Sequence, residues 1–147
     1  MDSGYLLSGE AGVCGYGEIE WRYINGAWRG VCTLTAPNYG PPALTLEIQV
    51  RPQRPSEITV VYLVNGDLLR RIDVNGAHKG RRYSHVQGKR SSEDAETTEP
   101  VPEWFVTVPF ARTVSEAAYR QVFFDAAKLF KVDAAAIAWS DPPEGSA

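Results

Sequence analysis

The stretch of sequence that decides the fold is ITVVYLVNGDLLRRIDVN, residues 58–75. Its first seven residues are β-branched or large and apolar, which is typical of a buried strand. Asn65 and Gly66 follow, and both tolerate the positive φ of a tight hairpin turn. The return arm places alternate side chains on opposite faces, with Leu68, Arg70, Ile72 and Val74 on one face and Leu69, Arg71, Asp73 and Asn75 on the other. The stretch therefore predicts a β-hairpin.

Alternating apolar residues predict further strands over residues 18–23, 27–35, 43–50 and 104–110, with Asn25-Gly26 as a second hairpin turn. Short turns between successive strands favour an antiparallel meander over βαβ units. Thr113 and Glu116 fit a capping box, and helical spacing of apolar residues predicts a helix over 114–131 that packs on the sheet. A final helical turn is expected over 133–138. The predicted fold class is α+β, with a mostly antiparallel sheet of six or seven strands, or a partly open barrel, and one packed C-terminal helix.

Length and composition set the expected domain organisation. A chain of 147 residues with 44% hydrophobic and 22% charged residues is typical of one globular domain. We expect a flexible N-terminal arm over residues 1–17, one domain over 18–140 and a disordered tail over 141–147. Neither a leader segment nor a membrane span is evident, so a cytoplasmic location without a membrane partner is expected. Cys14 and Cys32 lack zinc-site spacing, and Cys32 is expected to be a small buried side chain.

The charge of the chain is concentrated in one segment. The formal net charge is -3, yet residues 70–90 contain seven basic residues and only one acidic residue. The segment after the hairpin, 76–90, has little apolar content and is expected to form a basic surface loop. An acidic pI near 5.4 argues against nucleic-acid binding by the whole surface. Any such binding is expected to be local.

An acidic loop follows within the same domain, over residues 91–103. It contains five acidic residues and no basic residue. One interpretation is a solvated linker. The other is an intramolecular clasp, in which the acidic run shields the basic segment until a partner displaces it.

The basic segment suggests binding to a polyanion, with RNA or DNA as the expected partner. Arginine and lysine interleaved with aromatic rings suit a phosphate backbone whose bases stack on the rings. The predicted nucleic-acid-binding residues are Arg70, Arg71, Lys79, Arg81, Arg82, Tyr83, His85, Lys89 and Arg90. On this hypothesis the protein is a small binding module that needs no cofactor.

Two other hypotheses stay open. His78 and His85 are candidate catalytic residues of a metal-independent ribonuclease-like toxin, in which histidines move protons and arginines stabilise the phosphorane. A metal site is not expected, because two histidines need a third ligand and the nearby cations oppose a metal ion. The third hypothesis is a protein-interaction module or inhibitor without a nucleic-acid role. The oligomeric state is open.

Several short motifs occur in a recognisable order. They are the strand over 68–74, the Asn75-Gly76 turn followed by His78, the Ser84-His85 pair and the segment 104–109. In this order, over residues 45–112, the chain resembles a family of small uncharacterised bacterial and prophage proteins with an L-R-x-D strand, a Gly-His turn and a second histidine motif. Val86-Gln87 stands where that family has a further histidine. The resemblance implies a bacterial or phage source and a setting in defence or regulation.

Overall fold

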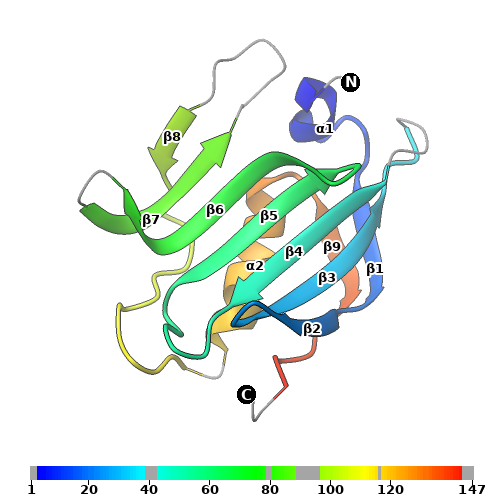
Figure 1. The fold of residues 1–147 in the computed structure, drawn as a ribbon. Coiled ribbons are helices and arrows are strands. Elements are labelled where there is room, and N and C mark those ends of the chain that lie inside the picture. Colours follow the sequence, from blue (N-terminus) through cyan, green and yellow to red (C-terminus); the bar gives the residue numbers. More distant parts are fainter. Residues whose placement is uncertain (1–2, 39–42, 79–80, 89–96, 116, 144–147) are drawn as a thin grey trace.

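A computed structural model describes residues 3–38, 43–78, 81–88, 97–115 and 117–143. The described residues form two helices and nine strands (Figure 1). In chain order these are α1 (Ser3–Ser8), β1 (Cys14–Glu18), β2 (Glu20–Ile24), β3 (Ala27–Thr35), β4 (Leu44–Val50), β5 (Ile58–Val64), β6 (Asp67–His78), β7 (Arg81–Gly88), β8 (Thr97–Pro100), α2 (Ala118–Leu129) and β9 (Asp133–Ala138).

All nine described strands belong to one open sheet. The strand order is β8-β7-β6-β5-β4-β3-β1-β9, and β2 pairs with β3 beside this path. Every pairing is antiparallel except that of β1 with β9, which is parallel. The predicted α+β class, mostly antiparallel sheet and single packed C-terminal helix are confirmed, and the described part of the sheet has more strands than the six or seven expected.

The core lies between the sheet and α2, which runs behind the central strands in Figure 1. The predicted alternation in β4 is confirmed, because Leu44, Leu46, Ile48 and Val50 are all buried. Cys32 is buried as expected, and burial raises the pKa of its thiol. Neither of the described helices has both the length and the apolar character of a membrane span.

The predicted central hairpin is present as β5 and β6. Asn65 and Gly66, in the turn between the two strands, have positive φ values of 51° and 83°. A β-bulge shifts the register at the start of β6, since Leu63 pairs with Leu68 and Tyr62 with Arg70. Leu68 is therefore 54% exposed whereas Ile72 is buried, and the prediction that the two residues share one face of the strand is wrong.

Three segments form elements other than those predicted. The expected basic loop over 76–90 is a strand hairpin of β6 and β7 where it is described. The expected loose arm contains α1 and β1, and Leu6 and Val13 are buried. Residues 133–138 form β9 instead of a helical turn, because parallel pairing with β1 satisfies their backbone.

The segment before α2 also differs from the prediction. Residues 104–110 do not form a strand, since side chains bind their backbone groups: Val106 N donates to Asp125 Oδ2 at 2.7 Å, and Val108 O accepts from Asn75 Nδ2 at 2.8 Å. The helix begins at Ala118, four residues later than expected, and no side-chain hydrogen bond caps it. Glu116 of the predicted capping box lies outside the described residues.

Two buried tyrosines predict opposite effects of removing a hydroxyl group. Within the described part of the chain, the Tyr62 hydroxyl is buried without a hydrogen-bond partner, whereas Tyr119 Oη donates to Pro55 O at 3.2 Å. An unsatisfied buried hydroxyl is costly and a satisfied one is not, so Tyr62→Phe should stabilise the protein by about 1 kcal/mol and Tyr119→Phe should destabilise it by about 1 kcal/mol. Urea denaturation at pH 7 measures both changes.

The stability difference between the wild-type protein and Tyr62→Phe should also depend on pH. Burial raises the pKa of Tyr62, so the unfolded state ionises first and wild-type stability falls as the pH rises above about 10. The advantage of Tyr62→Phe should therefore grow over that range. A loss of stability in Tyr62→Phe at pH 7 would contradict the assignment of an unsatisfied hydroxyl.

Candidate anion-binding site

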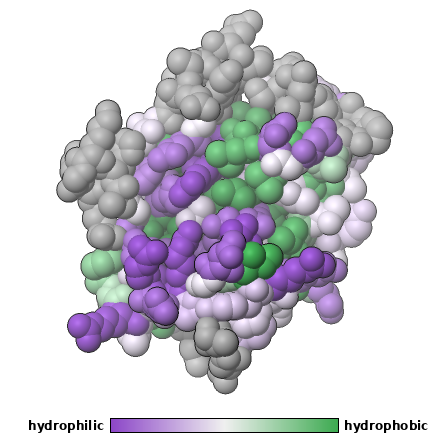
Figure 2. All heavy atoms as spheres, viewed as in Figure 1, coloured by the Kyte–Doolittle hydropathy of each residue, from purple (hydrophilic) through white to green (hydrophobic). Residues whose placement is uncertain are grey.

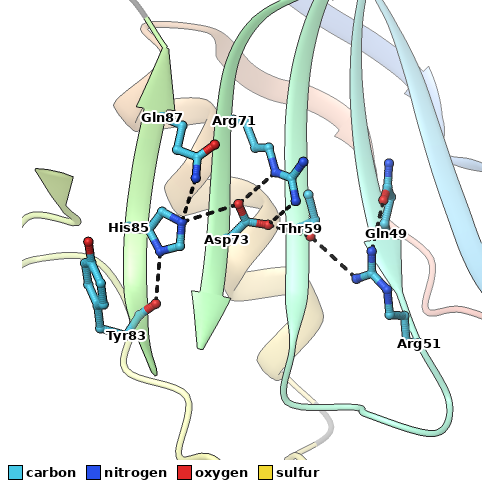
Figure 3. A network of polar contacts seen from close by, with 8 residues as sticks. All are labelled: Gln49, Arg51, Thr59, Arg71, Asp73, Tyr83, His85 and Gln87. Carbon is cyan, nitrogen blue, oxygen red and sulfur yellow. Dashed lines mark hydrogen bonds and ion pairs between the residues drawn. The ribbon is translucent and has the colours of Figure 1, made fainter. Parts of the chain in front are cut away.

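The face of the sheet turned away from α2 carries a continuous polar network, and we call it the polar face. Figure 2 shows hydrophilic side chains gathered over the sheet on this face. Strand alternation brings together residues that are paired across β4, β5, β6 and β7. In Figure 3 the network is formed by Gln49, Arg51, Thr59, Arg71, Asp73, Tyr83, His85 and Gln87.

Asp73 lies at the centre of this network. Arg71 donates two hydrogen bonds to its carboxylate, from Nε at 2.7 Å and from Nη2 at 2.9 Å. Thr59 Oγ1 donates a third, at 2.9 Å, from the neighbouring strand. Asp73 is 8% exposed as a whole residue. These three donors therefore replace the water that burial removes from its carboxylate. The two hydrogen bonds from Arg71 to Asp73 also fix the position of the Arg71 guanidinium.

His85 approaches the same carboxylate from β7, with Nε2 3.6 Å from Asp73 Oδ2. Its Nδ1 is 3.2 Å from the carbonyl oxygen of Tyr83, which only accepts hydrogen bonds. Its Nε2 is 3.0 Å from Gln87 Nε2, which donates. These two contacts fit a neutral imidazole with its proton on Nδ1. The ring is 1% exposed, so it supports the network and does not face solvent.

Arg51 contributes a cation to the edge of this face. Its guanidinium contacts Thr59 Oγ1 at 3.5 Å and Gln49 Oε1 at 3.4 Å, and both partners are neutral. Partial burial and the nearby Arg54 and Arg71 lower the pKa of Arg51. Asp73 and Glu57 oppose this shift, and a bound anion would favour the charged form of Arg51 in the same way.

A polar pocket of about 200 Å³ opens at this point. Arg51, Arg54 and Arg71 line it together with the acidic side chains of Glu57 and Asp73. Arg54 Nε is 3.8 Å from Glu57 Oε2, and Arg71 is paired with Asp73, so two of the three arginines have acidic neighbours. The lining residues carry one positive charge in excess.

A glycine in a β-bulge shapes the wall of the pocket. Between the pairs Asp73–His85 and Gly76–Tyr83, β6 advances by three residues and β7 by two, and Asn75 has a φ of 57°. A Cβ atom on Gly76 would lie 2.9 Å from Asp73 Cβ and 3.3 Å from His85 Cε1. The absence of a side chain at this position therefore keeps space open beside the Asp73 carboxylate.

The predicted binding residues do not form one surface. Arg71 lines the pocket, while Arg70 lies on the opposite face of the sheet because adjacent strand residues alternate. Tyr83 is half-buried, with its ring centroid 4.9 Å from that of His85. Lys79, Lys89 and Arg90 lie outside the described residues, as do the side chains of His78, Arg81 and Arg82.

The backbone register separates the two candidate catalytic histidines. His78 pairs with Arg81, which lies four residues from His85 along β7. Four residues of strand correspond to about 13 Å. A general acid and a general base have to reach one phosphate together, so this register does not favour the two-histidine mechanism.

The residues that sequence reasoning missed lie in or next to a turn. Arg51 and Arg54 belong to the connector between β4 and β5, which the sequence marks only by its two prolines. The signal was the pair of arginines within four residues, directly beside the strand that carries Thr59.

Part of the predicted acidic loop is a strand, because residues 97–100 form β8 and pair with β7 of the basic segment. Arg70 Nη2 lies 3.5 Å from Glu99 Oε1, across from β6 to β8. Residues 89–96 lie outside the described part, so the acidic residues at 93, 94 and 96 provide no test of the clasp.

No group of three or more histidine, cysteine, aspartate or glutamate side chains that could hold a metal ion occurs among the described residues.

Comparison of the chain with models of protein families, with curated proteins and with solved structures gave no match.

The role of Asp73 predicts a loss of stability on neutralisation. In Asp73→Asn the amide cannot accept the paired hydrogen bonds of Arg71, so we expect a destabilisation of about 2 kcal/mol in urea denaturation. Asp67→Asn, at an exposed position of the same strand, is the matched control and should change stability by less than about 0.5 kcal/mol. Equal losses in the two variants would contradict the central role of Asp73.

Proposed function

We propose that this protein is a non-catalytic binding module whose polar face engages the phosphates of a nucleic acid. The observation that carries the proposal is Arg51, a partly buried guanidinium that contacts neutral partners and lies in a pocket with Arg54 and Arg71. A guanidinium presents several N–H donors in a geometry that matches phosphate oxygens.

The size of the pocket favours one anionic group over a larger ligand. Sites that enclose drug-sized molecules have volumes of about 300–1,000 Å³. A volume of about 200 Å³ suits a single phosphate that projects from a longer chain. A nucleic acid presents such groups one after another, and the rest of the polymer then lies over the open sheet.

A second group of cations extends the polar face toward β2. Arg29 pairs with Gln49 across β3 and β4, and Arg22 pairs with Arg29 across β2 and β3. Three strand spacings separate Arg29 on β3 from Arg71 on β6, or about 14 Å. A flexible single strand can bridge this distance with successive phosphates, so the proposed contact is with the backbone and is independent of base sequence.

The proposal predicts salt-dependent binding that requires Arg51. Labelled single-stranded RNA and DNA should bind in fluorescence anisotropy, and Arg51→Gln should weaken binding about three- to tenfold at low salt. Loss of one phosphate contact should also reduce the slope of log K against log salt by about 0.7–0.9. The measurement is a titration repeated over a salt series, with circular dichroism to verify folding.

Arg120→Gln is the charge-matched control, because Arg120 lies exposed on α2, on the other side of the sheet. Absence of binding at low salt, or equal effects of the two substitutions, would overturn the proposal. Arg51-dependent binding of poly-glutamate without binding of nucleic acid would assign an acidic protein partner instead. RNA cleavage that His85→Ala abolishes would favour the ribonuclease hypothesis.

A further inference from the structure

A second, larger pocket lies on the opposite face of the sheet. It has a volume of about 410 Å³ and is bounded by strands β6 to β8, by the segment that follows β8 and by the end of α2. Its lining includes Arg70 from β6, Glu99 from β8, and Lys128 and Lys131 at the end of α2. This volume is within the range of sites that enclose a small organic molecule.

Basic side chains outnumber acidic side chains in the lining of this pocket. Three cations line it, Arg70, Lys128 and Lys131, against the single carboxylate of Glu99. The lining therefore carries two positive charges in excess at neutral pH. The distance of 3.5 Å between Arg70 Nη2 and Glu99 Oε1 is at the limit of a hydrogen bond, and the Glu99 side chain is 43% exposed. Glu99 can turn to solvent when another anion arrives.

An apolar wall stands beside these charges. Val86, Leu129 and Trp104 line the same pocket. Trp104 is 46% exposed, which is unusual for so large an aromatic side chain, and Lys128 Nζ lies 4.4 Å from the centroid of its ring. An exposed indole and a cation at one site provide both a stacking surface and a charge partner.

We propose that this pocket is a second ligand site, and that it binds a small aromatic phosphomonoester. A phosphomonoester carries up to two negative charges near pH 7 and so matches the two positive charges in excess. Its phosphate contacts Arg70 and the two lysines, in place of Glu99. Its aromatic ring lies against Trp104 and Leu129.

The site is independent of the proposed nucleic-acid contact. Arg70 and Arg71 are adjacent in β6, but Arg70 lines this pocket and Arg71 lines the pocket on the polar face. A variant of one arginine therefore tests one face of the sheet and serves as the control for the other.

The test is a titration of the full chain with phenyl phosphate, followed by tryptophan fluorescence and calorimetry. We expect saturable binding whose fluorescence signal is lost in Trp104→Phe. Lys128→Gln and Arg70→Gln should each weaken binding about tenfold, as expected for a charged hydrogen bond. Glu99→Gln should strengthen binding several-fold because it removes the competing carboxylate. Arg71→Gln should leave the affinity measured by the Trp104-dependent fluorescence signal unchanged, because Arg71 lines the pocket on the other face.

Two control ligands, each with only one of the two groups of phenyl phosphate, and variants of two exposed lysines complete the binding experiment. Inorganic phosphate and benzyl alcohol should each bind at least about tenfold more weakly than phenyl phosphate, because each lacks one set of contacts. If Arg70→Gln does not fold, Lys128→Gln and Lys131→Gln still carry the test, since both lysines are exposed. Absence of saturation up to about 10 mM, or an affinity that depends on Arg71 and on neither lysine, would overturn the proposal.

Discussion

The polar face depends on one carboxylate, that of Asp73. Its oxygens accept hydrogen bonds from Thr59 and Arg71 and lie beside His85, so side chains from three neighbouring strands meet there. A carboxylate this far from water costs several kcal/mol unless donors surround it. Arg71 and Thr59 supply those donors, and Thr59 Oγ1 also accepts from Arg51, so the Asp73 network and the arginines of the pocket are parts of one arrangement.

Strand periodicity divides the arginines of one basic segment between two pockets on opposite faces of the sheet. Side chains at successive positions of a strand point to opposite faces, so a run of arginines in the sequence cannot remain a single patch when it becomes a strand. Arg70 and Arg71 show this separation directly, since each lines a different pocket. The bulge at Gly76 then adds local space on the polar face only, beside Asp73 and His85.

The sequence predicted those elements whose local pattern and tertiary environment agree. The β5–β6 hairpin and the alternation of β4 have one buried face and turns that fix the register, and both were found. The prediction was wrong where pairing partners distant in sequence decide the structure. Residues 133–138 are rich in alanine and read as helical, yet β1 pairs with them in parallel. Residues 81–88 were expected to lie in a loop because the segment 76–90 has little apolar content, yet β6 and β8 pair with them and the polar network satisfies His85 and Gln87.

The burial of His85 bears on whether this face binds or catalyses. A general acid or base has to exchange a proton with a substrate, which requires an accessible ring nitrogen. Both nitrogens of His85 already contact protein groups, Tyr83 O and Gln87 Nε2, and the ring is 1% exposed. Its contribution is to close the network around Asp73 on the β7 side. Among the described residues, the pocket of the polar face presents the guanidinium groups of Arg51, Arg54 and Arg71 beside Glu57 and Asp73, and guanidinium groups hold anions but do not transfer protons at neutral pH.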